Sequence, residues 1–236
     1  MRHLFQKSIL LFLIFAATVS YSQQHIHLKK KDRRRDVELT TTKGVIVLHL
    51  YNETPLHRDN FLRLVKSHYY DSVLFHRVIK NFMIQAGDPQ SKRAEAGVEL
   101  GNGDPGYTVP AEFVPALFHK RGVLAAAREG DDVNPEKRSS GSQFYIVQGK
   151  TFTDAGLDSL ETFRLKGRKI PAEQRAVYKT IGGTPHLDQN YTVFGEVVRG
   201  MNVVDNIAAT PTSQQPADRP VEDVRIVKAT LVKQKR

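Results

Sequence analysis

Short runs of apolar and β-branched residues recur from Val37 to Val232, and stretches that contain glycine or proline separate them. Runs of this length and composition are typical of β-strands. The first two runs flank Thr42-Lys43-Gly44, which suits the turn of a β-hairpin. The later predicted strands cover residues 73–79, 122–127, 143–147, 191–198 and 221–232. In a chain of 236 residues this pattern predicts one compact, mainly β domain at 37–232.

Two helices are expected to accompany these strands. Thr54 can cap the first helix, which has Pro55 at its first position. An apolar face that includes Phe61 and Leu64 then indicates that this helix packs against a core. The second helix is short and covers residues 202–208.

Residues 150–185 differ in character from the chain on either side. They contain two further helical patterns, at 159–166 and 170–181, and Gly182-Gly183 follows the second one. We interpret the segment as a helical insertion between two strands. Because it ends close to Leu187 in the sequence, we expect it to form a wall or a lid beside a peptide-binding groove.

Cysteine is absent from the whole chain. This excludes a disulfide scaffold, a cysteine-ligated zinc site, an iron–sulfur cluster and a thiol nucleophile. The chain has nine histidines, but none of them shows a ligand spacing such as His-x-x-x-His within one predicted helix. We therefore expect neither a metal ion nor a cofactor.

The first 22 residues have the pattern of a secretory signal peptide. Arg2 and Lys7 form a short basic region, residues 9–19 are almost wholly apolar, and Ser20-Tyr21-Ser22 supplies small residues for a cleavage site. The apolar run is short for a bilayer, so an uncleaved anchor is the weaker alternative. The sequence predicts export to the periplasm or the extracellular space, with no membrane span after cleavage.

Residues 23–36 are strongly basic, with six Lys and Arg side chains in Lys29–Arg35 against Asp32 and Asp36. Such a run can bind nucleic acid or anionic lipid. No aromatic residues interleave with the charges, and export removes most nucleic-acid partners, so we favour a solvated basic linker and expect no nucleic acid partner. Residues 233–236 are expected to form a frayed tail.

The predicted strand Phe75–Ile79 carries an arginine among apolar residues. Side chains alternate along a strand, so Arg77 is expected on the face of the two end residues and His76 on the opposite face. Arginine is rarely placed on an apolar face unless a polar group meets it there. The polar group that meets Arg77 is either a bound ligand or a structural ion-pair partner. The candidates for a structural partner are Asp88 and Glu112.

Three motif blocks resemble the cyclophilins, the peptidyl-prolyl cis–trans isomerases of the barrel type. The first is Phe-His-Arg-Val-Ile followed by Phe-Met-x-Gln-x-Gly-Asp at 82–88. The others are Gly-Ser-Gln-Phe-Tyr-Ile at 141–146 and Leu-Asp-x-x-Tyr-Thr-Val-Phe-Gly at 187–195. The resemblance runs from Val37 to Val232 and implies a closed eight-stranded antiparallel β-barrel capped by two helices.

The same resemblance implies a site. The family's catalytic positions correspond here to Arg77, Gln85 and Phe82. Its substrate-binding positions correspond to Met83, Ala127, Arg128, Gln143, Tyr145, His186, Leu187 and Tyr191. At Ala127 and Arg128 a main-chain group makes the contact, so the identity of the side chain matters less.

Two positions depart from the pattern common in eukaryotic cyclophilins. His186 stands where a tryptophan is often found, and Tyr191 stands where a histidine is often found. The smaller and more polar ring of His186 implies that any binding of the inhibitor cyclosporin is weak.

The isomerase reaction that the resemblance implies requires neither a thiol nucleophile nor a metal ion. Rotation about an X–Pro amide meets a barrier of about 18–20 kcal/mol because resonance is broken. A fixed guanidinium can donate to the prolyl nitrogen more strongly in the twisted state than in the planar one. The sequence thus predicts an isomerase for proline-containing peptides and unfolded exported proteins. The alternative is a module that binds such peptides without turnover.

Overall fold

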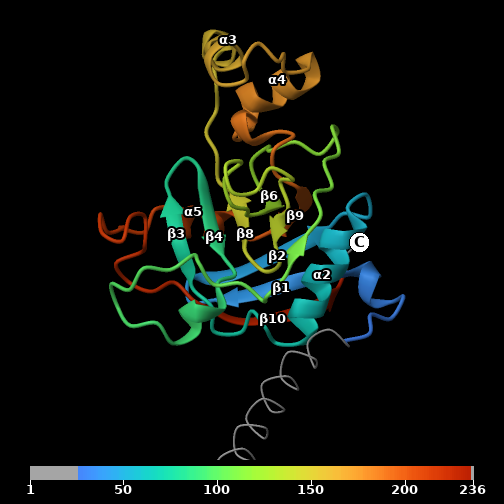
Figure 1. Ribbon diagram of the computed structural model, residues 1–236, viewed down its shortest axis with the longest axis vertical. Coiled ribbons are helices and arrows are strands. Elements are labelled where there is room, and N and C mark those ends of the chain that lie inside the picture. The colour runs from blue at the N-terminus through green and yellow to red at the C-terminus, as the bar shows by residue number, and fades with distance from the viewer. Residues whose placement is uncertain (1–25, 235–236) are drawn as a thin grey trace, which may run out of the picture.

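The computed structural model describes residues 26–234, so the signal peptide predicted at 1–22 lies outside the described residues. The chain forms an eight-stranded antiparallel sheet in the order β10-β1-β2-β9-β6-β8-β4-β3 (Figure 1). The strands are β1 (Arg35–Thr41), β2 (Gly44–Leu50), β3 (Phe75–Ile79), β4 (Met83–Ala86), β6 (Val123–Ala126), β8 (Phe144–Val147), β9 (Val193–Arg199) and β10 (Ile226–Lys233). A separate ribbon pairs β5 (Thr108–Val109) with β7 (Ser139–Ser140). The prediction of a mainly β fold is confirmed.

The sheet curls into a half-barrel and does not close, so the prediction of a closed barrel is wrong. Its two edge strands, β10 and β3, are not paired with each other, and the Phe75 N–H at the start of β3 donates at 2.8 Å to the carbonyl of Val224, two residues before β10 begins. Further along β3 the Val78 N–H donates instead to the carbonyl of Asp218, also at 2.8 Å. The loop at 209–225 thus takes the place beside β3 that an extended β10 would need to close the barrel.

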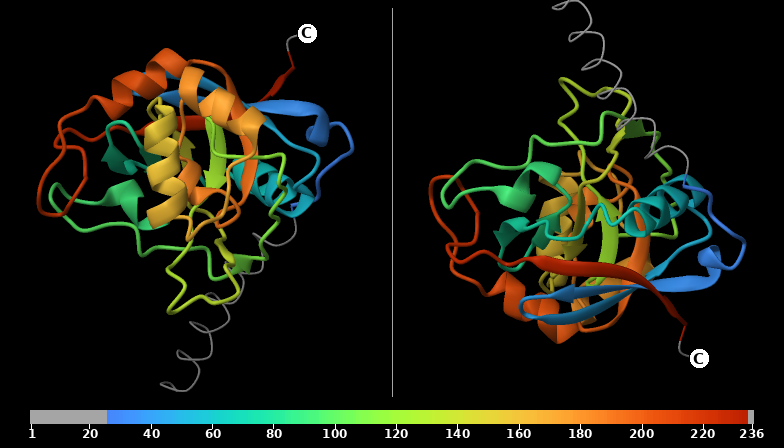
Figure 2. Two further views of the ribbon diagram at one scale, coloured as in Figure 1. Left: turned by 90° about the horizontal axis from the view of Figure 1, so that it is seen from above. Right: turned by 90° about the horizontal axis from the view of Figure 1, so that it is seen from below.

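Two helices, α2 (Pro55–Lys66) and α5 (Met201–Ala208), pack on the curled sheet and share one core with it (Figure 2). Seen from below, β10 (red) lies beside β1 (blue) across the base of this core (Figure 2). Fully or almost fully buried members of the core are Leu39, Ile46, Phe61, Leu62, Val65, Phe75, Leu124, Ile146, Val204 and Ile207. The two predicted capping helices are present where the sequence places them.

The N-terminus of α2 is capped over a long range in the sequence. Thr54 precedes the helix, but its hydroxyl has no hydrogen-bond partner in the part of the chain that the structure describes. The carboxylate of Glu112 accepts hydrogen bonds from the N–H groups of Leu56 and His57, at 3.0 and 2.9 Å, and from the His57 ring at 2.7 Å. The predicted side-chain cap by Thr54 is therefore wrong, and Glu112 satisfies the free N–H groups instead.

The central strands β4, β6 and β8 are buried on both faces. On the inner face Ile84 and Ile146 belong to the main core, whereas on the outer face Met83 and Tyr145 belong to a second apolar cluster. Because successive side chains of a strand alternate between faces, each of these strands supplies both clusters. The outer cluster is where the predicted site residues gather.

The predicted insertion contains two helices, α3 (Asp154–Phe163) and α4 (Ala172–Thr180), which stand at the top of the molecule in Figure 1. Helix α3 begins earlier than the pattern at 159–166 indicates, because the Thr153 hydroxyl accepts from the Gly156 N–H at 3.1 Å and caps it. The pair has a small core of its own, made by Leu157, Leu160, Leu165, Ile170 and Tyr178.

The segment before β1 differs from the solvated linker expected there. Leu28 is buried in the main core. The short 3₁₀ turn at 32–34 is tied to α2, because Arg33 pairs with Asp59 and Lys66 pairs with Asp32, each at 2.7 Å. The second half of the basic run is therefore docked on the domain, whereas the side chains of Lys29, Lys30 and Lys31 in its first half are exposed.

The other end of the domain is also more ordered than expected. Lys233, assigned to the frayed tail, is the last residue of β10 and pairs with Arg35 of β1. Within residues 26–234, no helix has the length and apolar character needed to cross a membrane.

Candidate functional site

A cavity of about 290 Å³ opens on the outer face of the sheet, over the apolar cluster of β4, β6 and β8. The predicted site residues that line it are Arg77, Phe82, Met83, Gln85, Ala127, Arg128, Tyr145, Leu187 and Tyr191. Gln143 and His186 are not among the lining residues. The structure thus brings together positions from four separate parts of the sequence.

Four side chains form an apolar cup in this cavity, namely Phe82, Met83, Tyr145 and Leu187. Met83 and Tyr145 project from the adjacent strands β4 and β8, and Leu187 comes from a short 3₁₀ turn at 185–187. All except Phe82 are buried. Their arrangement gives a concave apolar surface that suits a small apolar ring.

Arg77 lies at the edge of this cup with an exposed side chain. A β-bulge between Phe75 and Arg77 changes the alternation of β3, so that Phe75 and Val78 both belong to the main core, while Arg77 lines the cavity. The expectation that Phe75 shares a face with Arg77 is therefore wrong. The Arg77 Nε lies 3.3 Å from Oδ2 of Asp218, so the partner is neither Asp88 nor Glu112.

The two glutamines of the site are joined to each other. The amide of Gln85 donates to the side-chain oxygen of Gln143 at 3.0 Å. The amide of Gln143 in turn donates to the carbonyls of Gly101 and Gly103, at 2.7 and 2.9 Å. Gln143 lines a neighbouring cavity of about 590 Å³, and it positions Gln85 and the glycine-containing loop between the two cavities.

The two predicted backbone positions beside the cavity, Ala127 and Arg128, differ in their main-chain hydrogen bonds. The N–H of Ala127 donates to the Gln143 carbonyl, and its own carbonyl accepts from Ser140. Arg128 follows, and within residues 26–234 neither its N–H nor its carbonyl has a hydrogen-bond partner. Of the two predicted backbone positions, Arg128 is thus the one whose main chain is available to a bound peptide.

The side chain of Arg128 supports the wall of the cavity. Its guanidinium lies over the ring of Tyr191 at 4.6 Å from the centroid, and its Nε donates to the Asn190 carbonyl at 2.7 Å. The Tyr191 ring packs edge-on against Tyr145, with centroids 6.0 Å apart. Arg128 therefore fixes the position of Tyr191, and Tyr191 in turn packs against the apolar cup.

His186 lies beside the cup and is half-buried. Its ring stacks on Phe82, with centroids 5.5 Å apart and an angle of 24° between the planes. Burial, with a smaller effect from the positive charge of Arg164, lowers the pKa of His186 to about 4. The imidazole is therefore neutral near pH 7, and it acts on the cavity by supporting the Phe82 ring.

Sequence reasoning did not assign four further lining residues, His76, Leu100, Gly101 and Asn102. His76 is buried, and neither ring nitrogen has a hydrogen-bond partner within the described residues. Burial lowers the pKa of His76 to about 4. The sequence held a signal for both, since His76 lies inside the first motif and residues 100–102 lie in a stretch rich in glycine and proline, 86–110, that is typical of a functional loop.

Comparison with known proteins agrees with this geometry. Residues 36–231 match the family model described as cyclophilin type peptidyl-prolyl cis–trans isomerase/CLD. The chain is 34% identical over 201 residues to peptidyl-prolyl cis–trans isomerase-like 1 of Neurospora crassa, covering 84% of this chain and 95% of that protein. It is 34% identical over 197 residues to a Staphylococcus haemolyticus protein named for the same activity, covering 83% of this chain and 90% of that protein.

A Streptococcus pyogenes protein, whose name joins a phosphatase to a peptidyl-prolyl isomerase, is 38% identical over 194 residues. This chain covers 37% of that protein's length. Among solved structures, a cyclophilin-type isomerase of Cryptosporidium parvum has a TM-score of 0.60 at 23% identity, covering 85% of this chain and 99% of that chain. A second structure of that protein, solved in the presence of the dipeptide Ala-Pro, has a TM-score of 0.59 at 22% identity. Both show a shared fold.

Proposed function

This chain belongs to the cyclophilin-type peptidyl-prolyl cis–trans isomerases, and we propose that its isomerase activity depends on Arg77 above the apolar cup and serves exported proteins. The proposal is supported by the way in which Arg77, the apolar cup and the main chain of Arg128 are arranged around one cavity. A guanidinium lies at the edge of a buried apolar cup, and the main-chain N–H and carbonyl of Arg128, which have no partner within the described residues, lie on the same cavity.

The cup and the arginine have separate tasks in the reaction. The proline ring of the substrate sits in the cup, which holds it while the preceding carbonyl swings. In the twisted state the lone pair of the prolyl nitrogen is no longer delocalised, and Arg77 donates a hydrogen bond to it. This bond is stronger in the twisted state than in the planar amide, so it lowers the barrier and does not merely tighten binding.

The polar residues orient the chain of the substrate around its proline. The main-chain N–H and carbonyl of Arg128 pair with the peptide backbone, in the manner of a short β-bridge. Gln85 is held by Gln143 and lines the cavity, where it pairs with the substrate segment next to the proline. Since no covalent bond changes, this set of donors and apolar walls is chemically sufficient.

The proposal that the substrates are exported proteins is based on the N-terminal sequence. Residues 1–22 have the pattern of a cleavable signal, which sends the domain to the periplasm or the extracellular space. Proteins folding there contain X–Pro bonds that isomerise in tens to hundreds of seconds without catalysis. Unfolded exported proteins are therefore the proposed clients.

A protease-coupled assay with a proline-containing peptide tests the activity. The purified chain is expected to accelerate isomerisation, and Arg77→Ala is expected to remove most of this effect while peptide binding persists. Binding without turnover by the unaltered chain would instead identify a non-catalytic binding module. Mass spectrometry of protein from the native envelope tests export: a mature chain beginning near Gln23 is expected, and an intact Met1 in a cytoplasmic fraction would contradict it.

A further inference from the structure

A chain of four polar side chains runs from the apolar cup to the inserted helices. The Tyr145 hydroxyl lies 2.9 Å from Nε2 of His119, and Nδ1 of that ring lies 3.0 Å from Oδ1 of Asp188. The other carboxylate oxygen of Asp188 accepts a hydrogen bond of 2.6 Å from the hydroxyl of Tyr178 in α4. A wall of the cup is thus connected to the insertion through these four residues, here called the polar chain.

The polar chain is fully enclosed and its hydrogen bonds are complete. The exposed fractions are 4% for Tyr145, 0% for His119, 2% for Asp188 and 0% for Tyr178. Burial raises the pKa of both tyrosine hydroxyls far above the ordinary range, so both remain protonated donors. A carboxylate only accepts, so His119 donates from Nδ1 to Asp188, and its Nε2 shares a hydrogen bond with the Tyr145 hydroxyl. Buried polar networks of this kind fix one arrangement of their members.

Asp188 is connected to two walls of the cup, Leu187 and Tyr145. It follows Leu187 directly in the chain, and its main-chain carbonyl accepts from Arg168 of the insertion at 3.0 Å. Its carboxylate also accepts from the N–H of His119 at 2.8 Å. The His119 ring lies parallel to the Tyr145 ring within 15°. The positions of Leu187 and Tyr145 therefore both depend on this carboxylate.

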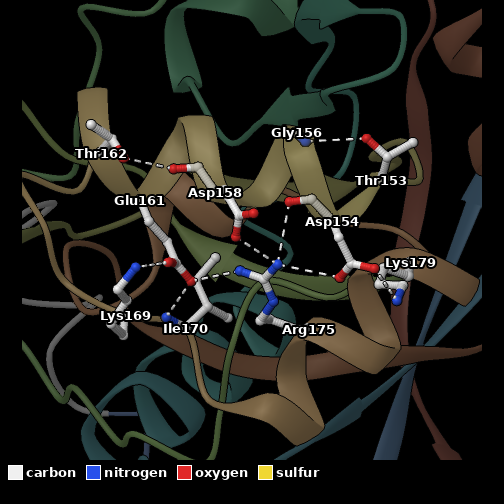
Figure 3. A network of polar contacts seen from close by, with 10 residues as sticks. All are labelled: Thr153, Asp154, Gly156, Asp158, Glu161, Thr162, Lys169, Ile170, Arg175 and Lys179. Atoms are coloured by element: carbon white, nitrogen blue, oxygen red, sulfur yellow. Dashed lines mark hydrogen bonds and ion pairs between the residues drawn. The ribbon is translucent and has the colours of Figure 1, made fainter.

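The far end of the polar chain is held by a second network within the insertion (Figure 3). Glu161 of α3, 2% exposed, accepts from Lys169, from the Ile170 N–H and from Arg175 of α4, at 2.8, 3.0 and 2.9 Å. These bonds, first that from Lys169, lower the pKa of Glu161 to about 2. Arg175 also pairs with Asp158 of α3 at 2.9 Å. Helix α4, which carries Tyr178, is thus fixed to α3.

We propose that Tyr178, Asp188 and His119 are positioning residues, through which the inserted helices hold Tyr145 and Leu187 in the apolar cup. The insertion is then a buttress for proline binding. This inference rests on the proposed function, because the cup is taken as the place of the proline ring. The cup contacts the ring in both the planar and the twisted state, so loosening it weakens both complexes and raises KM more than it lowers kcat.

The test is a double-mutant cycle on the full chain, with Tyr178→Phe, Tyr145→Phe and the two together. Each substitution keeps the ring and removes one hydroxyl. The readouts are kcat and KM for a proline-containing peptide, and the Kd of that peptide by titration. Tyr178→Phe is expected to raise KM and Kd about threefold to tenfold, with kcat changed by less than about twofold. In the Tyr145→Phe background, Tyr178→Phe is expected to raise KM and Kd by a smaller factor, because the ring at position 145 is already disconnected from the polar chain.

Thr180→Ala is the matched control, since Thr180 lies two residues after Tyr178 on α4, is exposed, and has a hydroxyl that donates to carbonyls of α4 itself. It is expected to leave KM and Kd unchanged. The inference would be overturned by an unchanged Kd in folded Tyr178→Phe, by an equal effect of that change in both backgrounds, or by an equal effect of Thr180→Ala. If Tyr178→Phe does not fold, His119→Asn, which keeps a donor for Asp188 but does not reach Tyr145, is judged by the same criteria. The Kd does not depend on turnover, so a failure of the catalytic proposal is seen separately in kcat.

Discussion

The carboxylate of Asp218 lies 3.3 Å from Nε of Arg77, on the side of the guanidinium nearest its aliphatic stem. Within residues 26–234, the two terminal nitrogens of Arg77 have no hydrogen-bond partner, so they remain available above the cup. The carboxylates that the sequence suggested are used elsewhere, Asp88 on the N–H of Gly101 and Glu112 on α2. Asp218 thus orients the arginine through its Nε–H and leaves the two terminal nitrogens free to donate.

The first prediction concerns Arg77 itself. Arg77→Ala is expected to lower kcat/KM at least about a hundredfold, near 3 kcal/mol of lost transition-state stabilisation. Arg77→Lys is expected to lose most activity too, because a flexible ammonium does not replace the planar fork. Thermal unfolding of both variants should match the unaltered chain, since the side chain is 45% exposed. Retention of half the activity in either variant would contradict the mechanism.

The second prediction tests the ion pair. Asp218→Asn keeps the shape of the side chain and removes the charge that holds Nε. Exposed ion pairs contribute about 0–1 kcal/mol, so kcat is expected to fall about twofold to fivefold. Asp223→Asn is the matched control, because Asp223 lies in the same loop and pairs with Arg219 instead. Steady-state kinetics on both variants checks this, and an equal loss in the control would show that loop geometry, not the charge, is responsible.

The third prediction is a dependence of stability on pH. The pKa of His186 falls from 6.5 to about 4 on folding, chiefly by burial. Between these values the unfolded chain takes up a proton that the folded chain does not, so the free energy of unfolding falls as pH falls from 6.5 toward 4. His186→Phe removes this titration and keeps the stack on Phe82. Urea unfolding at pH 7 and pH 5 is expected to show a smaller loss in the variant, and an equal loss would refute the assignment.

The fourth prediction concerns inhibition by cyclosporin, which we expect to be weak. His186→Trp extends the apolar surface that stacks on Phe82 and adds an indole N–H donor. A gain of about 50–80 Å² of apolar contact, at about 25 cal/mol per Å², together with one donor, predicts inhibition at least about tenfold tighter. An inhibition curve on both proteins decides this. Inhibition of the unaltered chain by low-nanomolar drug would show that His186 does not limit binding.

The fifth prediction concerns the long-range cap of α2. Burial acts to raise the pKa of Glu112, but hydrogen bonds from His57 and Leu56 outweigh it and lower the pKa below its usual value. Glu112→Ala frees two N–H groups and a buried histidine, and is expected to cost about 1–2 kcal/mol of stability. Thr54→Val, at a hydroxyl without a partner, is expected to change stability far less. Chemical denaturation measures both, and the reverse order would restore Thr54 as the cap.

The sequence predicted most of the site because its residues lie in three compact motifs, and strand alternation with turn chemistry predicted the hairpin and helix α2. The features that the sequence did not predict depend on contacts between residues that are far apart along the chain. The bulge at Phe75 exists only against β4, and the Arg77–Asp218 pair joins positions 141 residues apart. The partner that caps α2 lies 55 residues beyond His57. A local pattern has no means of indicating such contacts.

The burial of β4, β6 and β8 on both faces limits how this site can change during evolution. A new residue at Met83 or Tyr145 disturbs the packing that its neighbours Ile84 and Ile146 make on the inner face, and so risks the fold itself. The loop at 100–102 borders the same cavity from outside the sheet. New substrate preferences are therefore easier to acquire in that loop, while the strands preserve the part of the cavity that every proline shares.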